Sequence, residues 1–408
     1  MKTILKLSVY FLSLIIIFSF TQCNKNIPKL DLAYQTEGLL VTISGSVTNT
    51  DESISKLTID WGDSKSVELA NINFSEIEEK HKYSEPSTYE IIIKAQNIDG
   101  DSTIQSFTIT VDYMEATLDN IKSTMFKTTE NEFLILTVNL HTYQETDQIQ
   151  KFEFLSDVIA EMDIDFVAFQ ECAQHKSSPI VSGIIRDDNM AMIISSKLKE
   201  NYNVDYNYQW DWAHYGWDVW EEGVAVLSKY QSIDTDSKYI STITASNNIT
   251  SRKVIYGSYQ TPKGIINFFS AHTHWRTTTT DEEQNIQINN IKLMVSEKET
   301  VNTLPSFVCG DFNVNPTSDY PWSEGYNTMV LNNIFIDTFL KIYTDANTKP
   351  ALSIYNTIGG DFPGRIDYIF MKNNSHFTIE DSQIIFTKNI IGTISDHYAV
   401  ITKIKFVE

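Results

Sequence analysis

Acidic and amide side chains follow one of the most apolar runs of this sequence. The stretch 305–316, PSFVCGDFNVNP, ends its apolar part with Asp311, and Asn313 comes two residues later. Successive side chains of a strand point to opposite faces, so these two residues are expected on one face at the end of a sheet. A carboxylate and a carboxamide placed together supply the oxygen ligands that hard metal ions prefer.

Other apolar runs end in a similar way. The further polar residues at such ends are Asn139, Gln170, Glu171, His272, His274, Asp367, Asp396 and His397. Each alone has a structural explanation, such as a turn cap or a hydrogen-bonded histidine. Five strands with such ends are hard to explain by packing, because burying polar groups costs free energy. The set predicts a site where oxygen ligands such as Glu171 and Asp396 hold Mg²⁺, Mn²⁺ or Ca²⁺.

The residue types at these ends match the needs of phosphate ester hydrolysis. The negative charge of the phosphate must be neutralised, a water must lose a proton and the leaving oxygen must gain one. A metal ion, an aspartate and two imidazoles can provide all three.

The order of the motifs resembles the endonuclease/exonuclease/phosphatase superfamily, the deoxyribonuclease I and sphingomyelinase-like enzymes. The resemblance rests on six motifs: VN at 138–139, QE at 170–171, HTHW at 272–275, GDFN at 310–313, RIDYIF at 365–370 and SDH at 395–397. It covers residues 132–408 and implies a four-layer α/β sandwich, in which two packed β-sheets are flanked by helices.

The resemblance also implies roles for residues at the metal ion. Glu171 is expected as the principal metal ligand, with Asn139 beside it. Asp396 is expected to support a metal ion or the neighbouring imidazole. Asp311 is expected to orient or activate the attacking water.

A second group of roles concerns the phosphate itself. Asn313 is expected to hold a phosphate oxygen, while His397, oriented by Asp367, contacts the phosphate or takes a proton. His274 matches the family's other histidine, which stabilises the transition state or protonates the leaving group. His272 is displaced by two positions and is the alternative.

An aromatic stretch, residues 206–223 (YNYQWDWAHYGWDVWEEG), precedes the apolar run GVAVLSKY. We expect Trp212, His214 and Trp220 to line the substrate side of the cleft, because aromatic rings bind bases, sugars or lipid headgroups. In the alternative, the rings close a hairpin core.

Three substrate classes fit the predicted phosphoesterase: nucleic acid, phospholipid or sphingomyelin, and sugar or inositol phosphate. The formal net charge of −22 argues against a broad electrostatic grip on nucleic acid or anionic lipid. The alternative from another class is a catalytically inactive cell-surface binding protein with the same fold.

The first residues predict that the protein is attached to a membrane. Lys2 and Lys6 precede an uncharged run, residues 7–20, which is short for a bilayer span. The run ends before Cys23, so residues 1–23 resemble a bacterial lipoprotein signal peptide in which this cysteine is lipidated. The expected location is the bacterial cell envelope, lipid-anchored and either periplasmic or surface-exposed.

Two domains are expected after the signal peptide. Residues 30–112 alternate in short strand-like runs and carry WGD at 61–63, HKY at 81–83, STY at 87–89 and DG at 99–100. These landmarks resemble the PKD domain, a small all-β immunoglobulin-like spacer.

Residues 113–131 are expected to form a linker or a single helix, and residues 132–408 the α/β catalytic domain. Helical periodicity within that domain falls at residues 147–162, 186–200 and 281–298. Cys172 and Cys309 are expected as buried thiols, with a disulfide between them left open. We expect the protein to be a monomer.

Overall fold

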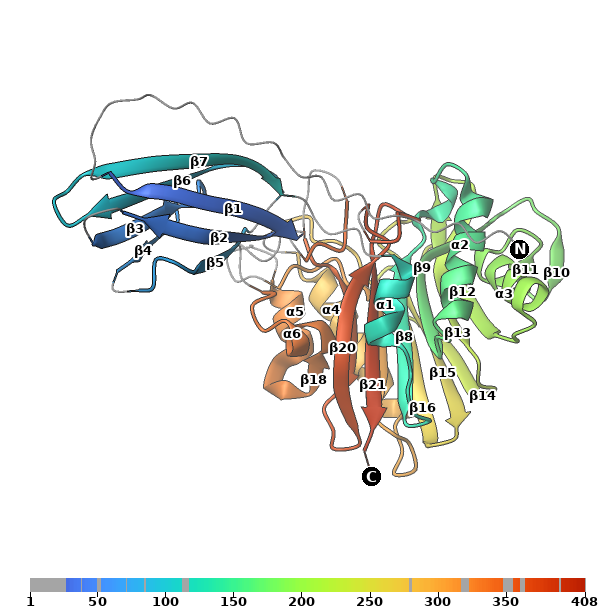
Figure 1. The fold of residues 1–408 in the computed structure, drawn as a ribbon. Helices are drawn as coiled ribbons and strands as arrows, with labels where there is room; N and C mark the ends of the chain where they lie inside the picture. The colour runs from blue at the N-terminus through green and yellow to red at the C-terminus, as the bar shows by residue number, and fades with distance from the viewer. Residues whose placement is uncertain are drawn as a thin grey trace, which may run out of the picture. The chain divides into compact units, whose positions relative to one another are not determined.

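The chain folds as two units, Met1–Asp112 and Tyr113–Glu408 (Figure 1). The computed structural model describes residues 27–37, 39–49, 53–70, 72–83, 86–111, 117–278, 281–316, 323–347, 355–359, 364–388 and 390–407. The predicted signal peptide and its Cys23 lie outside these ranges. Within them, no helix is both long enough and apolar enough to cross a membrane.

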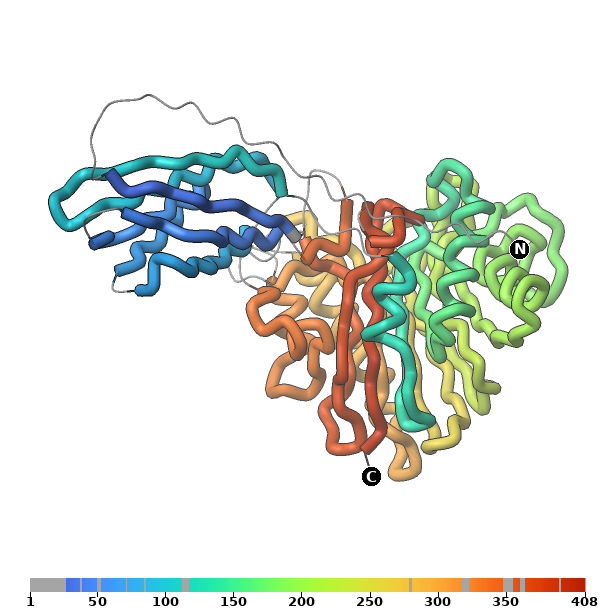
Figure 2. Tube along the Cα trace, in the orientation of Figure 1, coloured from blue at the N-terminus to red at the C-terminus, as the bar shows by residue number. Residues whose placement is uncertain are grey.

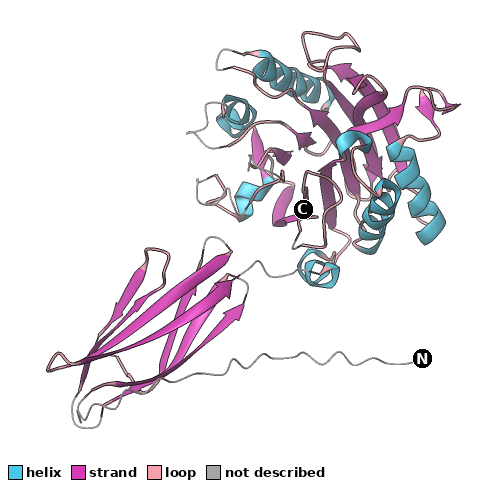
Figure 3. Cartoon of the chain, turned by 90° about the horizontal axis from the view of Figure 1, so that it is seen from above, coloured by secondary structure: helices cyan, strands magenta, loops and turns pink. Residues whose placement is uncertain are grey.

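The first unit is built from strands alone among its described residues, as Figure 3 shows. One sheet has the order β1–β2–β5 and the other β4–β3–β6–β7. The bounds are β1 Lys29–Glu37, β2 Leu40–Thr48, β3 Ile54–Asp60, β4 Ser66–Leu69, β5 Ile77–Lys82, β6 Ser87–Asn97 and β7 Ser102–Val111. Alternate residues of β6, Ile91, Ile93 and Ala95, are fully buried, as the two-residue period of a strand requires.

Residues of the WGD, HKY and STY motifs lie close together in this unit. The rings of Trp61 and His81 stack with their centroids 4.8 Å apart, and those of Tyr83 and Tyr89 lie 3.9 Å apart. The Tyr83 hydroxyl donates to the Trp61 carbonyl oxygen at 2.7 Å, and His81 Nε2 lies 2.8 Å from Asp63 Oδ2. The landmark residues therefore form one packed and hydrogen-bonded cluster.

The second unit contains two six-stranded sheets. The first has the order β12–β13–β9–β8–β21–β20, and its strands are β8 Glu132–Asn139, β9 Phe166–His175, β12 Asn207–Gly216, β13 Trp220–Ser228, β20 Phe377–Ile385 and β21 Ala399–Phe406. The second has the order β14–β15–β16–β17–β19–β18, and its strands are β14 Ser232–Tyr239, β15 Lys253–Thr261, β16 Gly264–His272, β17 Phe307–Asp311, β18 Phe335–Asp337 and β19 Asp367–Lys372. Figure 2 shows β21, near the end of the chain, beside β8, with which it pairs.

The two sheets pack face to face and helices cover their outer faces. Phe133 and Phe166 of the first sheet share a core with Phe268 and Phe307 of the second. The helices are α1 Leu118–Met125, α2 Gln148–Glu161, α3 Met190–Tyr202, α4 Glu283–Lys298, α5 Glu324–Val330 and α6 Thr338–Ile342. Side chains from α1, α2 and α3 pack on the first sheet, and those from α4 and α5 on the second. The predicted fold class, a four-layer α/β sandwich after a small all-β region, is confirmed.

Two parallel strand pairs bring the polar strand ends together. β8 runs parallel to β9 and β16 runs parallel to β17, with α2 and α4 as the respective crossover helices. The carboxyl ends of parallel neighbours meet at the same edge of a sheet. The residues that follow VAF and FFSA therefore lie at the same edges as Asn139 and Asp311.

The segment predicted as a linker contributes to the core of the second unit. Its helix α1 begins after Thr117, whose side chain accepts a hydrogen bond from the backbone N–H of Asn120. Ile121 and Met125 on this helix are buried in the core that covers the first sheet. The helix thus belongs structurally to the second unit.

Candidate active site

Three polar residues form a row across neighbouring strands of the second sheet. His272 at the end of β16 is paired in register with Asp311 at the end of β17, and Asp311 is paired with Asp367 at the start of β19. Residues opposite each other in a sheet point to the same face. His272 and Asp367 therefore lie on opposite sides of Asp311, and all three are buried.

His397 reaches this row from the loop before β21. Its Nδ1 lies 3.0 Å from Asp367 Oδ2, and its Nε2 lies 3.8 Å from Asp311 Oδ2. Burial opposes the charge of the imidazole, but the carboxylates of Asp367 and Asp311 outweigh burial and raise the pKa of His397 to about 10. The ring is therefore an imidazolium at neutral pH, oriented by Asp367.

Glu171 joins the row from the first sheet. Asn139, at the end of β8, donates its amide N–H groups to Glu171 Oε1 at 2.9 Å and to Asp311 Oδ2 at 3.2 Å. Burial and then Glu222 raise the pKa of Glu171 to about 7, and burial and then Asp367 raise the pKa of Asp311 to about 7. The site thus holds two carboxyl groups whose ionisation is costly in the protein alone.

This donor set fits a divalent cation. Ligand atoms of Glu171, His272 and Asp311 all lie within 4.8 Å of one another. A cation there would offset the cost of ionising the two carboxylates, because an opposite charge favours their charged form. Asp367 Oδ1, at the same edge, is also buried without a hydrogen-bond partner among the described residues. Asn139 orients the carboxylates, because its Oδ1 already accepts the backbone N–H of His141 at 3.0 Å.

Asn313 lies beside the row but outside the strand, because β17 ends at Asp311. Its backbone N–H donates to Asp311 Oδ1 at 2.8 Å, and its side-chain amide donates to the Thr273 carbonyl oxygen at 3.0 Å. The amide nitrogen also lies 3.3 Å from His272 Nε2. Asn313 has φ +48°, a strained value that the surrounding hydrogen bonds hold in place.

The structure brings His272, in place of the preferred His274, into the row. β16 ends at His272, and the chain then turns toward α4, where the His274 backbone N–H donates to Gln287 Oε1 at 2.7 Å. The Nδ1 of His274 is buried without a hydrogen-bond partner among the described residues. Burial and the nearby Arg252 lower the pKa of His274 to about 4. Strand register therefore places the imidazole of His272, the alternative in the sequence analysis, beside Asp311, while the role of His274 in the reaction stays a prediction.

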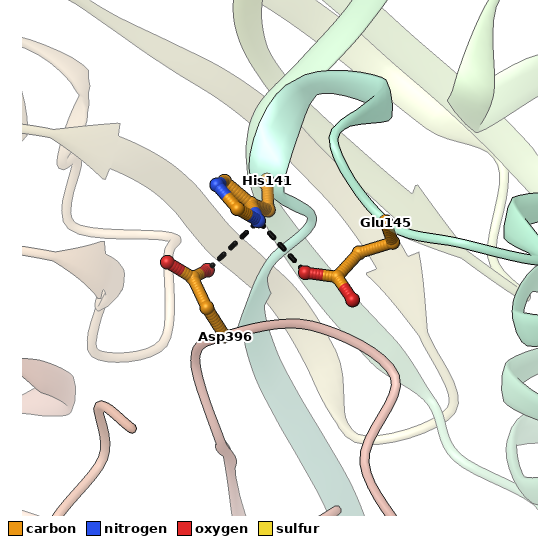
Figure 4. Close-up of side chains that lie close together, drawn as sticks. All are labelled: His141, Glu145 and Asp396. Carbon is orange, nitrogen blue, oxygen red and sulfur yellow. Dashed lines mark hydrogen bonds and ion pairs between the residues drawn. The ribbon is translucent and has the colours of Figure 1, made fainter. Parts of the chain in front are cut away.

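Asp396 lies in a neighbouring cluster and not beside Glu171. Its Oδ1 is 3.4 Å from His141 Nδ1, which also lies 2.7 Å from Glu145 Oε1. Figure 4 shows the imidazole of His141 between these two carboxylates. With 45% of its side chain exposed, Asp396 stands at the edge of the site, where its charge contributes to the raised pKa of Glu171. Ligand atoms of Asp396, His141 and Glu145 lie within 4.8 Å of one another, and the metal-supporting role of Asp396 stays a prediction.

The sequence analysis did not predict a buried network of hydrogen bonds and ion pairs next to Glu171. The Thr142 hydroxyl lies 2.8 Å from Glu222 Oε2 and 3.2 Å from the Glu171 carbonyl oxygen. Glu222 Oε1 lies 3.1 Å from His214 Nε2, and Arg252 Nη1 is 3.1 Å from the His214 ring nitrogens. The available signal was the acidic pair directly before GVAVLSKY, since a buried acid within a strand needs partners.

The aromatic stretch forms much of β12 and β13. Trp212 packs against the core beneath α2 and α3, and Trp220 stacks on Tyr143 with ring centroids 4.7 Å apart. His214 is only 2% exposed and belongs to the buried network with Glu222. Their packing corresponds to the alternative in which these rings close a core.

Comparison with solved structures shows proteins that are similar to this chain in fold. An endonuclease/exonuclease/phosphatase family protein from Leptotrichia buccalis C-1013-b has a similar fold, with a TM-score of 0.58 and 24% sequence identity. The match covers 67% of this chain and 100% of that chain. A Bacteroides thetaiotaomicron family protein has TM-score 0.48 and 16% identity, covering 68% of this chain and 98% of that chain. The human Nocturnin catalytic domain with bound sulfate anion has TM-score 0.49 and 14% identity, covering 68% and 95% respectively.

The sequence matches the profile of one protein family but no individual curated protein. None of the curated proteins compared with the chain matches it. The profile of the Endonuclease/Exonuclease/phosphatase family matches residues 146–397, which is more than half of the 408 residues. The chain therefore belongs to the endonuclease/exonuclease/phosphatase family, whose members are metal-dependent phosphoesterases.

Proposed function

We propose that the protein hydrolyses a phosphodiester or phosphomonoester by in-line attack of an activated water, with Mg²⁺ as the preferred ion and Mn²⁺ or Ca²⁺ as alternatives. The observation that carries this proposal is the convergence of Glu171 from the first sheet and His397 from the loop before β21 on Asp311 of the second sheet. Packing alone offers no reason to bury two carboxylates with raised pKa values beside an imidazolium.

Glu171 and Asp311 would hold the ion, with His272 as a third donor. When bound, the ion supplies positive charge that neutralises the phosphate and polarises it toward attack. The carboxylate oxygens favour Mg²⁺. The imidazole nitrogen of His272 would also allow Mn²⁺ to bind.

The remaining side chains would handle the phosphate and the protons. Asp311, once ionised, is placed to orient the attacking water and accept its proton. His397 is held as an imidazolium by Asp367, so its Nε2–H is available to a phosphate oxygen. Asn313 is proposed to hold a second phosphate oxygen. General acid–base steps of this kind are typically worth ~10²–10⁴-fold in rate.

The test is a hydrolysis screen of the full chain against DNA, RNA, sphingomyelin, phosphatidylinositol phosphates and sugar phosphates, each without metal and with Mg²⁺, Mn²⁺ or Ca²⁺. On the ester that is cleaved, Glu171→Gln and His397→Ala should each lower kcat/KM by more than roughly 10²-fold with the fold intact by circular dichroism. Near-native activity of either variant would reject the mechanism. Failure to cleave any ester with any of the three ions would favour an inactive cell-surface binding protein.

We also propose that the protein is a lipoprotein of the bacterial cell envelope. The support is the sequence of residues 1–23, which combines two lysines, a short apolar run and Cys23. The first unit would be a PKD-like spacer between the anchor and the catalytic unit, which the packing of Trp61, His81 and Tyr83 in its core supports.

A further inference from the structure

The proposed metal site draws its donors from both β-sheets. Glu171 lies on β9 of the first sheet, whereas His272 on β16 and Asp311 on β17 belong to the second. The distance between the two sheets therefore decides whether these side chains can reach one ion. Apolar packing is not directional and sets that distance only loosely, whereas hydrogen bonds fix it.

The strand β9 carries a β-bulge at Glu171. Between the pairs that Phe169 and Cys172 make with β13, two residues of β9 face a single residue of the partner strand. The two residues are Gln170 and Glu171, and Glu171 has φ +45°. Phe169 and Cys172, on either side of the bulge, both pack in the core beneath α2 and α3. The extra residue breaks the alternation of faces, so Glu171 can turn toward the donors of the second sheet.

Gln170 connects this bulge to the second sheet. Its side-chain amide donates to the Ser270 hydroxyl on β16 at 3.0 Å, and its Oε1 accepts from the Thr137 hydroxyl at 3.3 Å. The Ser270 hydroxyl in turn donates to the carbonyl oxygen of Phe169, at the start of the bulge, at 2.9 Å. One hydroxyl of the second sheet thus holds both the backbone and a side chain of the bulged strand.

Ser270 is close to the metal donors of its own sheet. It lies two positions before His272 on β16, so the two side chains point to the same face. Phe268, on that face as well, packs in the core between the sheets. The hydrogen bond between Gln170 and Ser270 therefore forms within the layer that separates Glu171 from His272.

Packing alone does not explain the polar side chains in this layer. Gln170, Ser270 and Thr137 are fully buried, and their neighbours between the sheets, such as Ala168 and Phe268, are apolar. Apolar residues would fill the same space without the free-energy cost of burying polar groups. A hydrogen-bonded pair adds a fixed geometry, which a metal site needs because its ligands must be oriented toward one ion.

We propose that Gln170 and Ser270 are positioning residues, which hold Glu171 at the distance from His272 and Asp311 that lets all three bind one divalent cation. This inference rests on the proposed metal-dependent function and adds a role for residues that touch neither the ion nor the substrate. Loss of such a supporting partner typically changes metal affinity or activity by roughly 10- to 100-fold.

The experiment measures binding of Mn²⁺ alone to the full chain by isothermal titration calorimetry, without substrate. Ser270→Ala and Gln170→Met should each raise the Kd for Mn²⁺ by roughly 10- to 100-fold. The double variant should bind Mn²⁺ no more weakly than the weaker single variant, because both changes remove the same link. Glu171→Gln, which removes a ligand, identifies the heat that belongs to this site.

The matched control is Thr402→Val, which removes another buried hydroxyl between the sheets. The Thr402 hydroxyl on β21 lies 2.9 Å from the Thr338 hydroxyl, which donates in turn to a carbonyl oxygen of β19. Thr402 is paired with Ile135 of β8, whereas Asn139 marks the end of β8 at the site. The control should lower the Tm as Ser270→Ala does and leave the Kd for Mn²⁺ unchanged.

The outcomes separate positioning from general stability. Unchanged Mn²⁺ affinity in both Ser270→Ala and Gln170→Met, or an equal loss of affinity in Thr402→Val, would overturn the inference. Additive losses in the double variant would also overturn it, because the two residues would then act independently. A wild type that binds Mn²⁺ but hydrolyses no ester would leave this inference in place and remove the proposed hydrolysis. A wild type that does not bind Mn²⁺ would remove both.

Discussion

Glu171 and Asp311 carry the main electrostatic cost of the site. Both are held near each other by one amide of Asn139, and the pKa of each carboxyl is raised to about 7 by burial and by neighbouring carboxylates. An acid with a raised pKa binds its proton more tightly in the folded than in the unfolded chain. The free energy of unfolding therefore falls as pH rises from the ordinary carboxyl range to about 7.

Glu171→Gln should remove part of this cost. Without metal, the variant and the wild type should melt at similar temperatures at pH 5, where the folded wild type keeps the proton of Glu171. At pH 8 the variant should melt roughly 3–10 °C higher, because the wild type must ionise a buried carboxyl group. Calorimetry at the two pH values, in chelator, measures the difference.

With Mg²⁺ at pH 8 the wild type should melt at a higher temperature than Glu171→Gln, because the ion should raise the Tm of the wild type more than that of the variant. The control is Glu153→Gln on α2, whose carboxylate is half-exposed and should change neither curve. A Tm difference between Glu171→Gln and the wild type that is independent of pH would contradict the proposed ionisation.

At the scale of elements, the turn after β8 holds the site together. His141, Thr142 and Tyr143 all have positive φ, between +39° and +58°, although none is glycine. Such a run is costly for residues with a Cβ atom, and it persists only where the surroundings fix it. The Thr142 hydroxyl does so by bridging Glu222 and the backbone of Glu171, which itself has φ +45°.

Thr142→Val should therefore weaken both fold and site. The variant keeps the β-branched shape but leaves Glu222 Oε2 without the hydroxyl, which costs about 1–3 kcal/mol of stability for a buried acceptor. We expect kcat on the cleaved ester to fall more than KM rises, since Glu171 loses its support. Thr142→Ser keeps the hydroxyl and should behave as the wild type. A loss in Thr142→Ser without a loss in Thr142→Val would show that the methyl group, and not the hydroxyl, matters.

Strand ends were predictable from the sequence, but strand register was not. The apolar runs located β8, β16 and β17, and the polar residue at the end of each gave Asn139, His272 and Asp311. The run VAF located β9, but this strand continues through Glu171 to His175. The choice between His272 and His274 depends on where β16 stops pairing, which motif spacing does not reveal.

The aromatic stretch shows a second limit of the sequence. Trp210 and Trp212 alternate as strand residues do, but both faces of a strand between a sheet core and helices are buried, so alternation cannot separate core from cleft. The exposed Trp217 instead occupies a turn, where its positive φ was not foreseeable for a tryptophan.

At the scale of the whole molecule, the catalytic unit should fold and act without the first unit. A chain that begins at residue 113 keeps α1, whose Ile121 and Met125 are buried in the core of the second unit. Its kcat/KM on a soluble ester should equal that of the full chain.

A chain that begins at residue 132 loses these two side chains from the core. Its stability should fall by on the order of 3 kcal/mol, measured by denaturant unfolding. Equal stability of the two shortened chains would show that the helix is dispensable, and inactivity of the longer one would show that the first unit takes part in catalysis.

Anchoring to the membrane, if it comes from Cys23, should be separable from catalysis. The net charge of −22 gives no attraction to anionic lipid, so attachment would depend on acyl chains, which contribute about 0.8 kcal/mol per buried CH₂. Cys23→Ser should therefore move the protein from the membrane fraction to the soluble fraction, while kcat/KM on a soluble ester stays the same, since the site is built within residues 139–397. Fractionation with detergent phase partitioning measures the first expectation and a hydrolysis assay the second. If the variant stays with the membrane as the parent does, the apolar run of residues 7–20 is an uncleaved anchor and the lipoprotein assignment is wrong.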